Sequence, residues 1–139
     1  MIFVDTWAWL ALAYAKDPYH QTAASQHQQF RREKRQYVTS ELVVSEFIST
    51  LFREVPFGQA KHFMMNFFQS VRAGRHRLIF VSPTQFQEAY GLRLRYHDKP
   101  DISFTDFTSM VVMKDLGIMD VFTGDVHFLQ VNLGFRLLP

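Results

Sequence analysis

Four acidic residues occupy positions from which they can meet at one metal site. Asp5 ends a short apolar run (MIFVD), and Asp125 follows another apolar run after a Thr-Gly pair. Asp106 stands three residues after a serine that can begin a helix, and Glu46 interrupts the apolar stretch VVSEFISTLF. Clustered carboxylates repel one another unless a cation neutralises them, and hard divalent cations prefer oxygen ligands. The four acids therefore predict a Mg²⁺ or Mn²⁺ site that can activate water and stabilise charge on a phosphodiester.

Each acid taken singly also has a structural interpretation. Asp5 can simply start the next helix, and Asp106 can be a capping residue, because the helix dipole favours an acid in the first turn. Glu46 can face solvent between two apolar stripes of its helix. If it faces the core instead, its charge is costly unless it is paired or bound to a cation. Both interpretations of Glu46 remain open at the level of sequence.

The elements that position these acids alternate along the chain. Strands are predicted at residues 1–5, 36–39, 78–81, 119–123 and 135–138. Helices are predicted at residues 6–15, 20–35, 41–54, 59–73, 83–96 and 103–116, with a short helical turn through residues 127–128. Ser40, Ser82-Pro83 and Ser103 are suitable helix starts, and Gly117 is a suitable helix stop. The alternation predicts an α/β sandwich with a parallel sheet, because parallel neighbours require crossover helices.

This architecture brings the acids to one edge of the sheet. Asp5 and Asp125 follow the carboxyl ends of two predicted strands, and Asp106 begins the helix that leads back into the fourth strand. Ligands of such sheets bind outside the carboxyl ends of the strands. We therefore expect Asp5, Asp106 and Asp125 to lie together there.

Length and composition predict a single domain spanning residues 1–139. The hydrophobic fraction of 47% and the charged fraction of 20% exclude global disorder. The chain has no cysteine, which excludes disulfides and zinc–thiolate sites. The apolar run at residues 7–15 is far shorter than the ~20 residues of a membrane span, and no secretory signal is recognisable. A cytoplasmic protein with no membrane segment is expected.

Clusters of basic residues predict contacts with a polyanion, although the formal net charge is only +2. Cations can hold phosphates while carboxylates hold a metal, as a nuclease requires. The alternative is that each cluster is a solvated helix end. The residues predicted to bind RNA are Arg31, Arg32, Arg35, Arg93, Arg95 and Lys99.

Four segments of the chain resemble the acidic blocks of PIN domains, and most closely those of VapC-type toxins of type II toxin–antitoxin pairs. They are FVDTWAWLAL, TSELVVSEFISTL, SFTDFTSMVVMKDLG and FTGDVHF, and they cover nearly the whole chain in the same order and spacing. The resemblance implies a PIN-like three-layer α/β/α sandwich around a central, mainly parallel sheet of four to five strands. It also implies Mg²⁺- or Mn²⁺-dependent endonucleolytic cleavage of RNA by a metal-activated water. In that family Asp5, Glu46, Asp106 and Asp125 would be the catalytic and metal-binding residues.

The resemblance further implies helpers and partners. Thr6 and Thr123 take hydroxyl positions that help to hold the acids or a water, and Ser109 is a weaker helper. A small antitoxin protein and a homodimer are the implied protein partners. Many of the 15 phenylalanines fall in residues 47–68, and one small domain is not expected to bury them all, which also favours a dimer.

Several other residues in or near these blocks are interpreted as structural. His127 follows Asp125 by two residues and can approach a phosphate, but such a histidine is more often a turn residue. Asp98 and Asp101 can widen the site, although a solvated loop is favoured. Glu41 and Asp120 are expected to be structural.

Three alternative functions are weighed against the toxin. A housekeeping PIN nuclease of RNA maturation would use the same chemistry in another context. A haloacid-dehalogenase-type phosphatase would need a second aspartate two residues after Asp5, where this chain has Trp7. A non-catalytic RNA-binding or scaffold module is disfavoured by four acids, since phosphate binding favours a basic pocket.

Overall fold

The sheet at the centre of the molecule has five parallel strands. The computed structural model describes residues 1–139, and its strands are β1 (Ile2–Val4), β2 (Tyr37–Ser40), β3 (His76–Ile79), β4 (Asp120–Phe122) and β5 (Arg136–Leu137). Their order across the sheet is β3-β2-β1-β4-β5, and every neighbouring pair is parallel. The predicted parallel sheet is therefore confirmed, and β1 lies in its middle.

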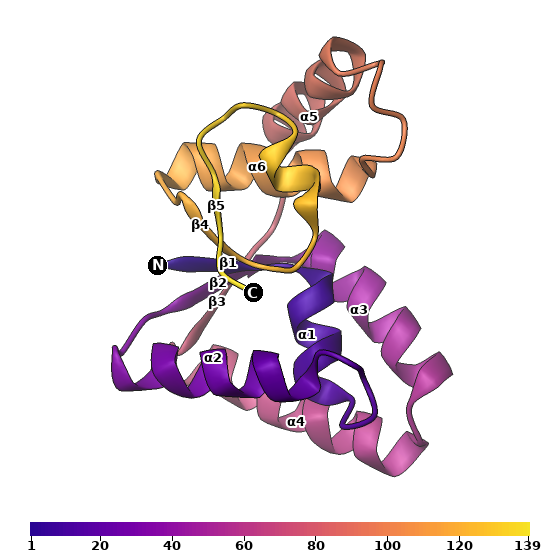
Figure 1. Cartoon of the computed structure of the whole chain (residues 1–139), viewed down its shortest axis with the longest axis vertical. Coiled ribbons are helices and arrows are strands. Elements are labelled where there is room, and N and C mark those ends of the chain that lie inside the picture. Colours follow the sequence, from indigo (N-terminus) through magenta and orange to yellow (C-terminus); the bar gives the residue numbers. More distant parts are fainter.

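Helices cover both faces of this sheet. They are α1 (Thr6–Ala13), α2 (His20–Arg32), α3 (Glu41–Glu54), α4 (Phe57–Arg72), α5 (Pro83–Arg95), α6 (Phe104–Leu116) and the short 3₁₀ helix η1 (Val126–Leu129). Figure 1 shows α5 and α6 on one side of the sheet and α1, α2 and α4 on the other. The chain moves from β1 outward to β3 and then returns to the opposite side for β4. Right-handed crossovers in two opposite directions place their helices on opposite faces, which yields the expected three-layer sandwich.

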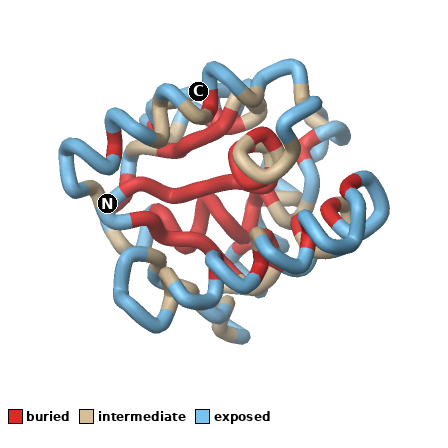
Figure 2. The backbone as a smooth tube through the Cα atoms, turned by 90° about the horizontal axis from the view of Figure 1, so that it is seen from below, coloured by how far each residue is buried: buried red, intermediate tan, exposed pale blue.

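The core follows the middle strands, where buried residues concentrate in Figure 2. All three residues of β1 are completely buried, and so is Phe122 of β4. Helix α6 is buried over eight consecutive residues, 106–113, because it lies between the sheet, α5 and the C-terminal segment. The buried run contains the polar residues Asp106, Thr108 and Ser109 as well as apolar side chains. None of the helices combines the length and the apolarity that crossing a membrane requires.

The predicted helix starts and stops are also confirmed. The Ser40 hydroxyl accepts a hydrogen bond from the amide of Val43 at 3.2 Å, and the Ser103 hydroxyl accepts one from the amide of Asp106 at 3.1 Å. Each bond satisfies an amide that has no partner within its own helix. Gly117 ends α6 in the left-handed conformation, with φ of 67°, which glycine adopts without steric cost.

One predicted strand is displaced in the structure. The apolar run at residues 78–81 predicts a strand there, but β3 occupies His76–Ile79 and Phe80 is 70% exposed. The partner strand explains the difference. Residues of β2 pair with β3 only as far as Ser40 with Ile79, because α3 begins at Glu41. The carboxylate of Glu41 then accepts a hydrogen bond from the amide of Val81, which confirms a structural role for Glu41.

Candidate active site

Three aspartates reach the carboxyl edge of the sheet from three different elements. Asp5 follows β1 directly and stands at the N-cap position of α1. Asp125 follows β4 after two residues and caps η1. Asp106 lies in the first turn of α6, placed there by the Ser103 cap. β1 and β4 are adjacent, but the chain adds β2 and β3 on one side of β1 before it returns to add β4 on the other side. The acids therefore lie at the switch point, where the strand order changes direction and where such folds bind ligands.

Thr123 connects two of these acids. Its hydroxyl donates a hydrogen bond to Oδ2 of Asp5 at 2.9 Å and accepts one from the amide of Asp125 at 3.0 Å. The side chain of Thr123 is fully buried. A carboxylate at β1 and the turn after β4 are thereby held in one hydrogen-bonded unit. The predicted position of Thr123 beside the acids agrees with this geometry.

The acids are desolvated and repel one another. Burial, together with the charge of Asp106, raises the pKa of Asp5 from 3.8 to about 7. Burial, together with the charges of Asp125 and Glu46, raises the pKa of Asp106 to about 6. No lysine or arginine offsets these effects; the ion pairs of Asp106 and Asp125 are with His127 alone. Uncompensated buried carboxylates of this kind are stabilised by a cation.

Glu46 stands at the exposed side of this group. Its side chain projects from α3 into solvent rather than into the core, which decides between the two interpretations of its position. Its charge nevertheless contributes to the raised pKa of Asp106. Glu46 therefore lies close enough to influence the site without being buried in it.

The two remaining hydroxyl helpers differ. Thr6 is buried, and its Oγ1 has no hydrogen-bond partner although it directly follows Asp5 in the chain. Ser109 is also buried, but its hydroxyl donates to the carbonyl of Thr105 within α6 at 3.1 Å. The hydroxyl of Thr6 is thus available to a further ligand, and that of Ser109 is occupied by its own helix.

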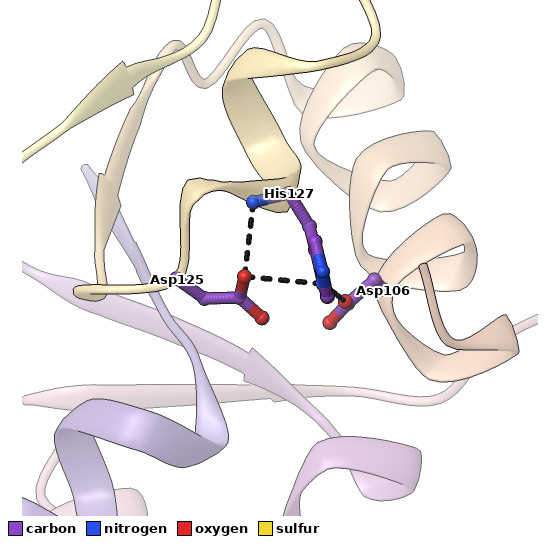
Figure 3. A group of neighbouring side chains, drawn as sticks. All are labelled: Asp106, Asp125 and His127. Carbon is purple, nitrogen blue, oxygen red and sulfur yellow. Dashed lines mark hydrogen bonds and ion pairs between the residues drawn. The ribbon is translucent and has the colours of Figure 1, made fainter. Parts of the chain in front are cut away.

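His127 lies between two of the acids, where the sequence favoured a turn residue. Its Nδ1 is 3.1 Å from Oδ1 of Asp125 and 3.4 Å from Oδ2 of Asp106. Figure 3 shows the imidazole standing between the two carboxylates. The amide of His127 also donates to Oδ1 of Asp125 at 2.9 Å. The only sequence signal for this position was that His127 follows Asp125 by two residues. That spacing lets the amide of His127 bond the side chain of Asp125, which caps a short helix.

The donor set fits a hard divalent cation. Carboxylate oxygens of Asp106 and Asp125 and a nitrogen of His127 lie within 4.8 Å of one another. The buried Asp5 carboxylate and the unpartnered Thr6 hydroxyl add oxygen atoms in the adjoining segment. Carboxylates without a neighbouring lysine or arginine are suitable ligands for Mg²⁺ or Mn²⁺.

The basic residues that were predicted to bind RNA are dispersed. Arg31 and Arg35 line an open pocket of about 690 Å³ at the amino ends of β2 and β3, the edge opposite the acids. Arg35 pairs there with Asp120 at 2.6 Å, which confirms a structural role for Asp120. Arg32, near the same end of α2, donates to Gln29. The structure does not bring this cluster together with the acids.

The second basic cluster consists of Arg93, Arg95 and Lys99 and lies nearer the acids. Two of its side chains are engaged by other groups of the protein. The guanidinium of Arg93 donates to the carbonyls of Tyr96, Lys99 and Ile102, which secures the loop before α6. Arg95 stacks over the ring of Tyr96 at 5.3 Å.

The loop between α5 and α6 borders the site. Lys99, Asp98 and Asp101 line a pocket of about 330 Å³ whose wall includes His127. Of the residues predicted to bind RNA, Lys99 is therefore the one that shares a pocket with His127.

Comparison with known proteins agrees with this fold. No family model and no curated protein sequence matches the chain. Among solved structures, the toxin VapC20 of Mycobacterium tuberculosis, described as cleaving the sarcin–ricin loop, has a TM-score of 0.78 and 28% sequence identity. The match covers 98% of this chain and 99% of that one. FitAcB from Neisseria gonorrhoeae has a TM-score of 0.69 at 14% identity, covering 100% of this chain and 97% of that one, and it shows the fold alone. The PIN-like fold and the resemblance to VapC-type PIN toxins are confirmed.

Proposed function

We propose that this chain, which resembles the VapC-type PIN toxins in sequence and fold, is a Mg²⁺- or Mn²⁺-dependent endoribonuclease that hydrolyses RNA phosphodiester bonds. We further propose that it is the toxin of a type II toxin–antitoxin pair and acts in the cytoplasm. The observation that supports this most directly is the meeting of Asp5, Asp106 and Asp125 at the switch point of the sheet. A toxin that cleaves the sarcin–ricin loop is similar over its full length.

The acids have defined roles in this proposal. Asp5, Asp106 and Asp125 would hold the cation, with Glu46 at the exposed side. When bound, a divalent cation supplies the Lewis acidity that activates water and stabilises charge on phosphate. The chain itself supplies orientation, because the acids are held before any substrate arrives. Thr123 fixes Asp5, and the amide of His127 fixes Asp125.

The substrate would be held through its phosphates. Lys99 lines a pocket whose wall includes His127, and from there it would contact the backbone of an RNA strand entering the site. Further phosphate contacts are proposed for Arg95, Arg93, Arg31, Arg32 and Arg35. Such contacts position an RNA without reading its sequence.

Cleavage of defined RNAs tests the proposal. The substrates are an end-labelled hairpin carrying the sarcin–ricin loop and a hairpin of equal length with a scrambled loop. Each is incubated with the protein in EDTA, in Mg²⁺ and in Mn²⁺. We expect cleavage within the chain only when a cation is present. Absence of cleavage of every RNA under all three conditions would leave a binding module as the better description.

A matched pair of variants on α6 makes this test specific. Asp106→Asn should lower the cleavage rate roughly 100-fold or more, since losing a metal ligand costs at least as much as losing a group that orients one. Asp115→Asn makes the same change on the exposed part of the same helix, where the side chain contacts only Gln85. The Asp115→Asn protein should cleave at the wild-type rate.

The proposed antitoxin should exploit the same acids. A guanidinium presents a planar set of donors that engages carboxylates bidentately, so an Arg- or Lys-bearing segment of a small protein suits this site. Such a segment would pair with Asp5, Asp106 or Asp125 and exclude the cation. A peptide inhibitor whose single arginine is changed to alanine should then lose inhibition, and unchanged inhibition would place the contact elsewhere.

A further inference from the structure

His127 is the one group at the acidic site that the family resemblance does not assign a role. Its Nδ1 lies 3.1 Å from Oδ1 of Asp125 and 3.4 Å from Oδ2 of Asp106. These three atoms come from α6 and from η1 with its N-cap residue Asp125 (Figure 3). A nitrogen donor and two carboxylate oxygens thus face one small volume.

The position of this imidazole is fixed by the backbone around it. Asp125 caps η1 by accepting a hydrogen bond from the amide of His127 at 2.9 Å. The amide of Asp125 is in turn bound to Thr123, which also holds Asp5. One continuous set of hydrogen bonds therefore positions both Asp125 and His127 relative to the buried acid. The side chain of His127 is 26% exposed, so solvent ions can reach it.

The spacing of these atoms suits chelation. Two donors at right angles around a cation with bonds of roughly 2.1 Å lie about 3 Å apart. The measured separations of Nδ1 from the two carboxylate oxygens are close to this value. The unpartnered Thr6 hydroxyl, beside Asp5, is an independent sign of a ligand that the protein atoms alone do not provide.

We propose that Nδ1 of His127 is a protein ligand of the catalytic cation and that it makes the site prefer Mn²⁺ to Mg²⁺. The inference rests on the proposed function, because it concerns the same cation site. Magnesium is held almost entirely by oxygen ligands in near-ideal octahedral geometry. Mn²⁺ also takes carboxylate oxygens, but as a first-row transition-metal ion it accepts an imidazole nitrogen more readily than Mg²⁺ does. A site made of carboxylates alone would lack this reason to prefer Mn²⁺ to Mg²⁺.

Metal binding measured without RNA tests this directly. Calorimetric titrations with Mn²⁺ and with Mg²⁺ are compared for the wild-type protein and for His127→Ala. We expect the dissociation constant for Mn²⁺ to rise roughly tenfold or more in His127→Ala. The constant for Mg²⁺ should change much less. His127→Asp, which offers an oxygen in place of the nitrogen, should strengthen Mg²⁺ binding and abolish the preference.

Two controls keep the result interpretable. His62→Ala removes an exposed imidazole from α4, far along the chain from the acids, and should leave both dissociation constants unchanged. His127→Asn keeps a polar group at the position and reveals whether loss of the side chain disturbs the fold. Circular dichroism of each variant should match the wild-type spectrum.

Spectroscopy of the Mn²⁺-loaded protein gives the decisive readout. Electron spin-echo envelope modulation should show a ¹⁴N coupling from a directly bound imidazole, and His127→Ala should lose it. Binding of Mn²⁺ without that coupling would overturn the inference and would mean that the imidazole is only a counter-charge for the acids. The proposed ribonuclease activity would then still stand. Conversely, a ¹⁴N coupling in a protein that cleaves no RNA would refute the activity and leave the ligand assignment intact, whereas failure to bind Mn²⁺ at all would refute both.

Discussion

At the scale of single residues, the Asp5 carboxylate that the site needs lowers the stability of the metal-free fold. Its carboxyl is almost completely buried, and its pKa of about 7 is raised above the ordinary value of 3.8. The folded state therefore binds a proton over a pH range in which the unfolded chain has already lost it. Stability from this group falls as pH rises from about 4 through about 7, and the full penalty applies above that range. A bound cation would remove the penalty, which is how such a site can be retained.

Asp5→Asn should raise the stability of the metal-free protein while abolishing cleavage. The amide keeps the volume and an acceptor for Thr123, but it carries no charge to bury. In EDTA at pH 8 the Tm should rise by at least roughly 3 °C, since about 1 kcal/mol shifts the Tm of a domain of this size by several degrees. At pH 4.5, where the wild-type carboxyl is protonated in the folded state, the gain should be much smaller. Thermal melts at the two pH values measure it, and a lower Tm than wild type at pH 8 would contradict the prediction.

Thr123→Val should impair cleavage with little change in fold. Valine has the same shape, but it cannot donate to Asp5 or accept from the amide of Asp125. Groups that orient metal ligands typically contribute 10–100-fold to affinity or activity, so we expect a loss of roughly that size. Thr123→Ser restores the hydroxyl and should recover most of the rate. Equal activity of the valine and serine variants would show that the bond is not used.

At the scale of elements, the site depends on how closely the turn after β4 approaches α1. Gly124 separates Thr123 from Asp125, and a Cβ added there would lie 2.5 Å from the indole carbons of Trp7. Only glycine permits this approach. The turn that carries Asp125 is thereby held against the first residues of the helix that follows Asp5.

Gly124→Ala should therefore move the turn or displace the indole. We expect a loss of roughly 1–3 kcal/mol of stability, as for other overpacked positions, together with reduced cleavage. Gly91→Ala is the matched control, because its added methyl group meets open space within α5. Alanine should stabilise that helix by about 0.5–1 kcal/mol. Chemical denaturation of both variants checks the opposite signs, and a neutral Gly124→Ala would contradict the close packing.

At the scale of the whole molecule, charge and apolar surface are distributed unevenly. The cluster from Arg31 to Arg35 lies at the amino edge of the sheet, and the acids lie at the carboxyl edge. Two groups of exposed apolar side chains are candidate contact surfaces. One is the corner between α3 and α4, with Phe52 and Phe57, and the other is α5, with Phe86, Tyr90 and Leu94 at helical spacing.

Homodimerisation stays a prediction and now has two candidate surfaces. The structure buries Phe47 and Phe67 but leaves Phe57 71% exposed and Leu94 56% exposed. We expect a dimer mass by light scattering at micromolar concentration, because exposed apolar surface of this kind is typical of obligate interfaces. Phe57→Glu and Leu94→Glu introduce the same charge at the two surfaces, and the variant that becomes monomeric identifies the interface. A monomer mass for the wild-type protein would contradict the prediction.

The salt dependence of RNA binding shows whether the RNA contacts the carboxyl edge of the sheet, the amino edge or both. Affinity for an uncleaved RNA, measured with Asp125→Asn as the background, should fall steeply as salt rises, because displaced counterions oppose association. Lys99→Gln should reduce the slope by roughly one unit if Lys99 contacts a phosphate. Neutralising Arg31, Arg32 and Arg35 together should flatten the slope further only if the RNA extends to the far edge. No change with any of these variants would exclude both clusters from the RNA path.

Much of the site could be predicted because its placement depends on local signals and one general rule. Apolar runs and serine caps located the strands and helices, and Asp5, Asp106 and Asp125 stand at their ends. In a parallel sheet those ends meet at one edge, whatever the details of packing. The hydroxyl position of Thr123 was instead implied by the resemblance to PIN domains.

Only the tertiary structure decided what depends on contacts between distant segments. It placed His127 between Asp106 and Asp125, turned Glu46 toward solvent, and engaged Arg93 with three carbonyls of a loop. It also shifted β3 to the register that β2 allows. The type of a residue limits which bonds its side chain can make. The elements that pack against the side chain determine which partner it bonds to. For that reason the proposed acidic ligands could be predicted from the sequence, while the nitrogen ligand we propose could not.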